Sequence, residues 1–180
     1  AGDPAFVPFS AGCAGAELFP NLRLNLIARE LLRRLPAHSA HYDLPPGVEA
    51  LRRQIARRSL AIRCEVAPRD VIVTAGALEA INLSLRAVAK PGDVIAVESP
   101  MYFAILGSVA SLDMKTIEIP THAKEGMDLE HLERAIRKHK IKACITMTNC
   151  HDPLGYVLPD ESKRALVDLT SRTNVAVIED

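Results

Sequence analysis

The stretch VIVTAGALEAINLSLRAVAKPGDVIAV, residues 71–97, carries the pattern that decides the fold class. It begins with a short β-branched run at 71–74 and ends with a second apolar run at 94–97. Between these runs, the apolar residues recur at the spacing of one helix face: Leu78, Ile81, Leu85 and Val88. The stretch therefore predicts a strand, a helix over 77–89 and a second strand in succession.

The same alternation of short apolar runs and helical patterns continues to residue 180. The further expected strands are 116–119, 143–148 and 175–178, and the further expected helices are 22–35, 47–59, 128–140 and 160–172. Strands that are apolar along their whole length favour burial on both faces, as in a parallel sheet covered by helices. We therefore expect an α/β fold of three layers, with a mainly parallel sheet between helices.

The composition is typical of a cytoplasmic α/β protein. The 180 residues suffice for one well-buried domain or for a large piece of a longer protein. The 22 basic and 22 acidic residues cancel, so the charge gives no argument for nucleic acid or membrane as a partner of this segment. No apolar run approaches the roughly 20 residues that span a bilayer. Because the chain starts without Met and stops directly after an apolar run, we expect a piece of a longer protein.

The cysteines do not have the spacing of a metal site. No C-x-x-C pair occurs among the four of them, which are Cys13, Cys64, Cys144 and Cys150. We expect reduced thiols and no metal ligands.

Residues that could bind a ligand directly follow three of the expected strands. The small-residue turn around Gly76 precedes a helix, whose unpaired N–H groups suit a phosphate, although a glycine there can also serve the turn alone. Tyr102 follows the strand at 94–97 and is either an aromatic that stacks on a planar ligand or a half-buried core residue. Asp180 follows the last strand and either faces a cation or protonated nitrogen, or is an exposed loop acid.

A fourth segment, Asn-Cys-His-Asp-Pro-Leu-Gly at 149–155, contains three residue types of a catalytic triad. We reject a triad, because its members normally come from separate parts of a chain and point at one another. Three consecutive side chains, Cys150, His151 and Asp152, splay apart. The Asp-Pro-x-Gly portion is typical of a turn.

Taken together, these motifs resemble the aminotransferase class I/II family, the fold-type I enzymes that use pyridoxal phosphate. The resemblance covers nearly the whole chain and is closest to the aminotransferase-like domain of GntR-type transcription regulators of the MocR group. It is carried by Leu18-Phe19-Pro20, by the turn Tyr42-Asp43-Leu44-Pro45-Pro46-Gly47 and by Leu51-Arg52. It implies an arm with a first helix over 1–46 and a partial pyridoxal-phosphate-binding large domain over 47–180.

The resemblance implies roles for particular residues. Gly76, Ala77 and Leu78 match the positions whose backbone N–H groups bind the cofactor phosphate. Tyr102 matches the aromatic that stacks on the pyridine ring. Asp180 matches the acid that keeps the ring nitrogen protonated, which strengthens the cofactor as an electron sink.

Two further positions concern the dimer and a departure from the family. Tyr42 matches the tyrosine that reaches the phosphate of a neighbouring subunit, so the resemblance implies a homodimer. Asp152 stands where the family usually has an asparagine that donates to the ring oxygen of the cofactor. An ionised aspartate only accepts hydrogen bonds and repels a phenolate, so either Asp152 is protonated, or the cofactor sits differently, or the affinity is reduced. Of these we expect reduced cofactor affinity.

The resemblance leaves three functions open. The family's Schiff-base lysine and its carboxylate-binding arginine are expected beyond Asp180, so this chain alone is not expected to catalyse transamination. The favoured hypothesis is an effector domain that senses an amino acid or amine, in a regulator that binds DNA through a domain preceding residue 1. The alternatives are part of an aminotransferase that transfers amino groups to 2-oxo acids, and an inert α/β domain that keeps the fold.

Overall fold

The computed structural model describes residues 15–35 and 41–180. The elements, in chain order, are η1 (Ala16–Leu18), α1 (Asn21–Arg34), α2 (Glu49–Ser59), η3 (Leu60–Ile62), η4 (Pro68–Asp70), α3 (Ala77–Val88), β1 (Val94–Ser99), α4 (Phe103–Ser111), β2 (Lys115–His122), β3 (Gly126–Met127), α5 (Leu129–Lys138), β4 (Ile141–Thr146), α6 (Asp160–Thr173) and β5 (Ala176–Glu179), where η denotes a short 3-10 helix.

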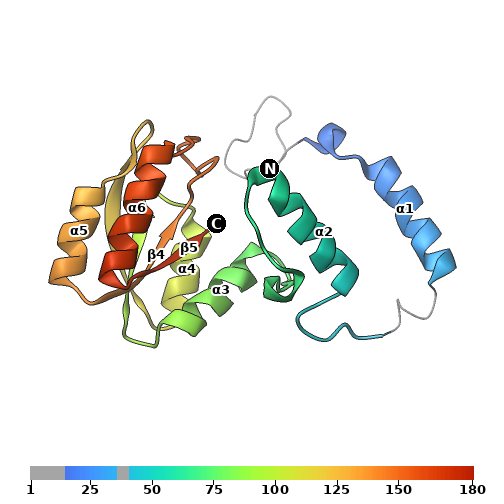
Figure 1. Cartoon of the computed structure of the whole chain (residues 1–180), viewed down its shortest axis with the longest axis horizontal. Coiled ribbons are helices and arrows are strands. Elements are labelled where there is room, and N and C mark those ends of the chain that lie inside the picture. Colours follow the sequence, from blue (N-terminus) through green and yellow to red (C-terminus); the bar gives the residue numbers. More distant parts are fainter. Residues whose placement is uncertain (1–14, 36–40) are drawn as a thin grey trace, which may run out of the picture.

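One sheet with the strand order β3-β2-β1-β4-β5 forms the centre of the fold. β1 runs parallel to β2 and β4, and β4 runs parallel to β5, whereas the two-residue β3 pairs antiparallel with β2. Helices α3 and α4 pack on one face of the sheet and α5 and α6 on the other (Figure 1). The expected three-layer α/β fold with a mainly parallel sheet is thereby confirmed.

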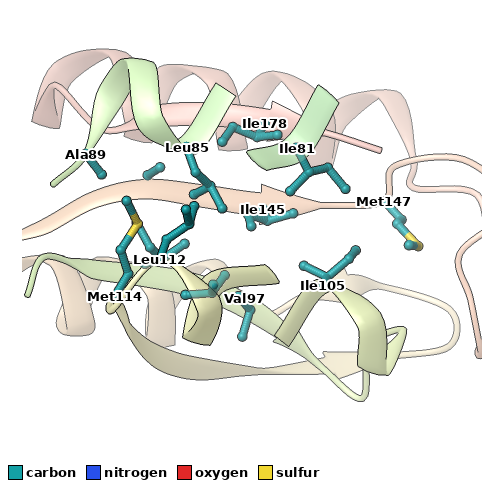
Figure 2. Packing of buried hydrophobic residues seen from close by; sticks show 13 residues of the cluster. Ile81, Leu85, Ala89, Val97, Ile105, Leu112, Met114, Ile145, Met147 and Ile178 are labelled. Atoms are coloured by element: carbon teal, nitrogen blue, oxygen red, sulfur yellow. The ribbon is translucent and has the colours of Figure 1, made fainter. Parts of the chain in front are cut away.

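The apolar core lies in two clusters, one on each face of the sheet. Figure 2 shows the first, in which Leu85 of α3 and Ile105 of α4 meet Ile145 of β4. In the second, Leu132 of α5 and Leu166 of α6 pack on the opposite face. Burial of one such side chain contributes about 1.5–3 kcal/mol to folding, so these clusters fix the strands and their ends in place.

The five expected helices lie where the sequence pattern predicts them, with ends that differ by at most two residues. The start of α5 shows why: Asp128 is its N-cap, and its carboxylate accepts a hydrogen bond from the backbone N–H of His131 at 2.8 Å. Four of the five expected strands correspond to β1, β2, β4 and β5. The sequence analysis did not predict α4 or β3. Residues 1–14 of the expected arm lie outside the described residues, and Ala16–Leu18 forms a single 3-10 turn.

The expected strand at 71–74 is wrong. These residues are not paired into the sheet, and the backbone N–H of Val73 donates to the carbonyl oxygen of Pro46 at 3.0 Å. Ile72 remains 64% exposed. β-Branched residues favour an extended backbone, but a strand also needs a partner strand, and the local sequence cannot supply one.

Helix α1 forms as expected but packs on little else in the described chain. All of its residues are exposed, including Leu22 at 77% and Leu26 at 59%. Figure 1 shows α1 at the far side of α2 from the sheet. Within the described ranges, no helix has both the length and the apolar character needed to cross a membrane.

Candidate cofactor site

The carboxyl ends of three neighbouring strands meet at one edge of the sheet. β1, β4 and β5 are parallel, so the residues that follow Ser99, Thr146 and Glu179 lie along the same edge. The backbone N–H of Asp180 donates to the carbonyl oxygen of Thr146 at 3.1 Å, so Asp180 is still tied to β4. In open α/β sheets, this is the edge at which ligands bind.

Helix α3 begins at the same edge. In Figure 2, Met147 lies just past the arrowhead of β4. Ile81, near the start of α3, lies toward this end of the strand, whereas Ala89, just after α3, lies toward the opposite end. The turn around Gly76, which precedes α3, and the residues that follow β1, β4 and β5 therefore lie on one side of the molecule.

The start of α3 offers free backbone donors. Gly76 is the N-cap with a φ of 98°, a left-handed conformation that favours glycine. The N–H of Ala75 is already engaged by the carboxylate of Glu79. The N–H groups of Ala77 and Leu78 donate to no other residue of the described chain. A Cβ added at Gly76 would meet no atom within 4 Å, so the space beside this glycine is open. A helix start with free N–H groups fits an anion such as phosphate.

Tyr102 and Asp180 differ in burial. Tyr102 is the N-cap of α4, is half-buried against the first core cluster, and its ring centroid lies 4.9 Å from that of Phe103. It thus combines a core contact with a partly free ring. Asp180 is exposed, and its carboxylate forms no ion pair with any described residue. This acid is available to a protonated nitrogen from outside the chain.

The segment after β4 turns its successive side chains in different directions. Cys150 is exposed and has a φ of 51°, His151 is 1% exposed, and Asp152 is exposed. The three side chains do not converge, which agrees with the rejection of a catalytic triad.

A buried carboxylate that the sequence analysis did not single out lies beside these loops. Glu98, near the end of β1, is only 1% exposed. Its oxygens accept hydrogen bonds from the Thr146 hydroxyl at 3.0 Å, the Met147 backbone N–H at 2.8 Å and the Tyr156 hydroxyl at 2.5 Å. The Nε2 of His151 lies 3.3 Å from Glu98 Oε2. We call these five residues the Glu98 network.

Burial and Glu98 change the acidity of Tyr156, a member of the network, and of the nearby Cys144 thiol. Burial, together with the hydrogen bond to Glu98, raises the pKa of Tyr156 well above its ordinary value. Burial first, and the negative charge of Glu98 second, raise the pKa of the Cys144 thiol to about 12. A glutamate that directly follows the apolar run 94–97 was the available sequence signal, by the same reasoning that singled out Asp180.

Tyr42 lies apart from this edge, and a cavity at the edge does not include the predicted site residues. Tyr42 is 97% exposed in the segment between α1 and α2, so the described chain does not bring it to the strand ends. A cavity of about 280 Å³ beside the ends of β4 and β5 contains none of the seven predicted site residues. It is lined by Thr148, Asn149, Lys163, Leu166, Val167, Val177 and Glu179. Within the described ranges, no three His, Cys, Asp or Glu residues are grouped as metal ligands.

Known proteins provide the context for this arrangement. Residues 23–180 match the family model of aminotransferase class I and II. The chain belongs to this family.

Within the family, both regulators and enzymes are similar to the chain. The HTH-type transcriptional regulator YdcR of Escherichia coli is 41% identical over 99% of the chain and 38% of its own length. An archaeal alanine:glyoxylate aminotransferase has a TM-score of 0.89 at 30% identity, over 94% of the chain and 43% of its own. The kynurenine aminotransferase of Pyrococcus horikoshii, solved in complex with PMP, has a TM-score of 0.81 at 27% identity, over 90% of the chain and 41% of its own. The chain thus spans less than half the length of these relatives.

Proposed function

We propose that the chain is part of a pyridoxal-phosphate-binding domain that senses an amino acid or amine in a GntR-type transcription regulator of the MocR group. The observation that carries the cofactor proposal is the open start of α3, with free donors on Ala77 and Leu78 at the edge where β1, β4 and β5 end. The identity of 41% to an HTH-type regulator over 99% of the chain, against 27–30% for the two enzymes of known structure, supports the regulator.

Each predicted site residue has a task in this proposal. The N–H groups at the start of α3 bind the phosphate, and Tyr102 covers one face of the ring. Asp180, exposed and without an ion pair in the described chain, accepts the hydrogen of the ring nitrogen. When bound, the cofactor supplies an aldehyde that combines with amino groups and a ring that accepts electrons. Asp152 opposes binding, because its carboxylate repels the phenolate oxygen of the cofactor.

The proposal includes a cytoplasmic homodimer. Tyr42 is nearly fully exposed, which suits a residue that reaches the phosphate of a neighbouring subunit. The apolar residues of α1 are exposed as well, and a second copy of the chain would cover them. The same proposal keeps 1–46 as an arm with its first helix and 47–180 as the partial large domain.

The alternative function is amino-group transfer between an amino acid and a 2-oxo acid. The TM-score of 0.89 with an archaeal alanine:glyoxylate aminotransferase favours it. Both functions use the same cofactor site, so the residues of this chain alone do not separate them.

One experiment on the intact protein separates the two functions. The protein is loaded with pyridoxal phosphate, and a panel of amino acids is tested in two assays: retention of promoter DNA and transamination of 2-oxo acids. The regulator proposal expects at least one amino acid or amine to change DNA affinity several-fold, with negligible turnover. Steady turnover without any DNA binding would replace it with the aminotransferase.

A further inference from the structure

We propose that Glu98 is a positioning residue: its buried carboxylate holds the loop after β4, residues 147–156, against the end of β1 and thereby sets the place of Asp152. The consequence for the cofactor rests on the proposed function. The anchoring of the loop does not, and it can be measured without cofactor.

The hydrogen bonds to Glu98 come from both ends of this loop. Thr146 and Met147 lie at its start, where β4 ends, and donate at 3.0 and 2.8 Å. Tyr156 lies at its far end and donates at 2.5 Å. One carboxylate therefore closes the loop at its base. Without these donors, a buried carboxylate would be costly, so the loop and Glu98 stabilise each other.

His151 and Tyr156 form the interior of the loop. Their rings stack with centroids 4.7 Å apart and an interplanar angle of 17°. The Nδ1 of His151 accepts a hydrogen bond from the Leu154 N–H at 3.3 Å, which places the ring hydrogen on Nε2. That Nε2 lies 3.3 Å from Glu98, but its N–H is not aligned for a hydrogen bond, and Nε2 has no other partner in the described chain.

Backbone hydrogen bonds fix His151 within the loop, and with it the adjacent Asp152. The N–H of His151 donates to the carbonyl oxygen of Tyr156 at 3.0 Å, and the N–H of Gly155 donates to that of His151 at 2.5 Å. Asp152 is the next residue and is directed outward, while His151 is directed inward. A shift of His151 away from Glu98 must therefore move the Asp152 carboxylate.

Glu98 also lies close in sequence to the other predicted ring contact. Tyr102 follows it by four residues, in the turn between β1 and α4. The Glu98 network thus joins the two loops that carry Tyr102 and Asp152. A carboxylate with a purely local role in the core would not affect a ligand that contacts these loops.

Isosteric variants of the intact protein test the inference. Thr146→Val and Tyr156→Phe each remove one hydroxyl that donates to Glu98. Thr170→Val is the matched control, because the Thr170 hydroxyl is equally buried, at 3% exposure, but donates to the Leu166 carbonyl oxygen within α6. Each variant is measured by hydrogen exchange without cofactor and by titration with pyridoxal phosphate.

The expected results distinguish loop anchoring from general stability. In both network variants, the amide hydrogens of Leu154 and Gly155 exchange at least tenfold faster, while that of Val97 in β1 is unchanged. Pyridoxal phosphate binds at least twofold more tightly in both network variants, because the released loop lets the Asp152 carboxylate move away from the phenolate oxygen that it repels. The control shows neither change.

Several outcomes would overturn the inference. Unchanged exchange at Leu154 and Gly155 in both network variants rules out the anchoring. Equal acceleration at Val97 reveals general loosening instead of a specific role. Faster loop exchange with unaltered or weaker affinity removes the positioning of Asp152. If the wild-type protein binds no pyridoxal phosphate, the cofactor function and its dependence on Glu98 both fail, while exchange still decides the anchoring.

Discussion

The acidic residues at the strand ends occupy contrasting environments. Glu98 is buried and accepts three hydrogen bonds, whereas Asp152 and Asp180 are exposed. In the proposed site, the two exposed acids would have opposite effects: Asp180 would face a ring nitrogen that carries a hydrogen, and Asp152 would face a ring oxygen that carries negative charge. Two side chains of the same charge would therefore contribute with opposite signs, because the ring atoms that they face differ in charge.

Replacement of Asp152 by asparagine should strengthen cofactor binding. The amide can donate to the ring oxygen and removes the repulsion, a change of about 1 kcal/mol or roughly fivefold in affinity. A titration of absorbance with pyridoxal phosphate measures it. Asp168→Asn, the same change of charge at an exposed position of α6, should leave the affinity unaltered. Equal affinities of Asp152→Asn and the wild type would refute the proposed role.

The thiol of Cys144 should make folding stability depend on alkaline pH. Burial raises its pKa from an ordinary value of 9.0 to about 12, so above pH 9 the unfolded chain loses this proton while the folded chain keeps it. Stability therefore falls with rising pH, by roughly 1 kcal/mol per pH unit between pH 9 and 12. Urea denaturation at pH 8, 9 and 10 should show this slope for the wild type and a smaller one for Cys144→Ala. Identical slopes would mean that Cys144 titrates normally.

At the scale of elements, local patterns predict helices better than they predict strands. The helical spacing over residues 77–89 and the cap at Asp128 predict α3 and α5, because the forces involved act within a few residues. The run at 71–74 has the composition of a strand but no place in the sheet. The apolar α4 was missed because its residues are apolar on most sides and give little periodicity.

Two glycines should respond in opposite directions to alanine. Gly76 has a φ of 98°, so alanine strains the backbone although no atom lies within 4 Å of the new Cβ. We expect a loss of about 1 kcal/mol of stability and weaker phosphate binding. Gly107 lies within α4, has equally open space and no positive φ, so Gly107→Ala should add about 0.5–1 kcal/mol. Thermal denaturation of both variants tests this, and a gain of stability in Gly76→Ala would contradict it.

At the scale of the whole molecule, the sequence predicts the three-layer fold and the turns that meet at one edge. It does not predict the Glu98 network, because Thr146 and Tyr156 are 48 and 58 residues away from Glu98 along the chain. Such contacts depend on how the strands pair, which local patterns do not specify. The cofactor-binding roles of the seven site residues and the domain boundary at residue 46 stay predictions.

The exposed apolar residues of α1 provide a test of the proposed dimer. Leu26→Glu should weaken self-association of the intact protein at least tenfold, because a charge would be buried against the second copy. Asn25→Glu adds the same charge at a neighbouring polar position and should have a smaller effect. Sedimentation equilibrium measures both. A wild-type protein that stays monomeric at micromolar concentration would exclude the dimer.

The most direct test of the cofactor site is a spectroscopic titration of the intact protein with pyridoxal phosphate, for the wild type and for Asp180→Ala. We expect a saturable absorbance change in the wild type and at least tenfold weaker binding in the variant, with thermal stability unaltered because Asp180 is exposed. No saturable change in the wild type, or equal affinity in the variant, would contradict the proposed site.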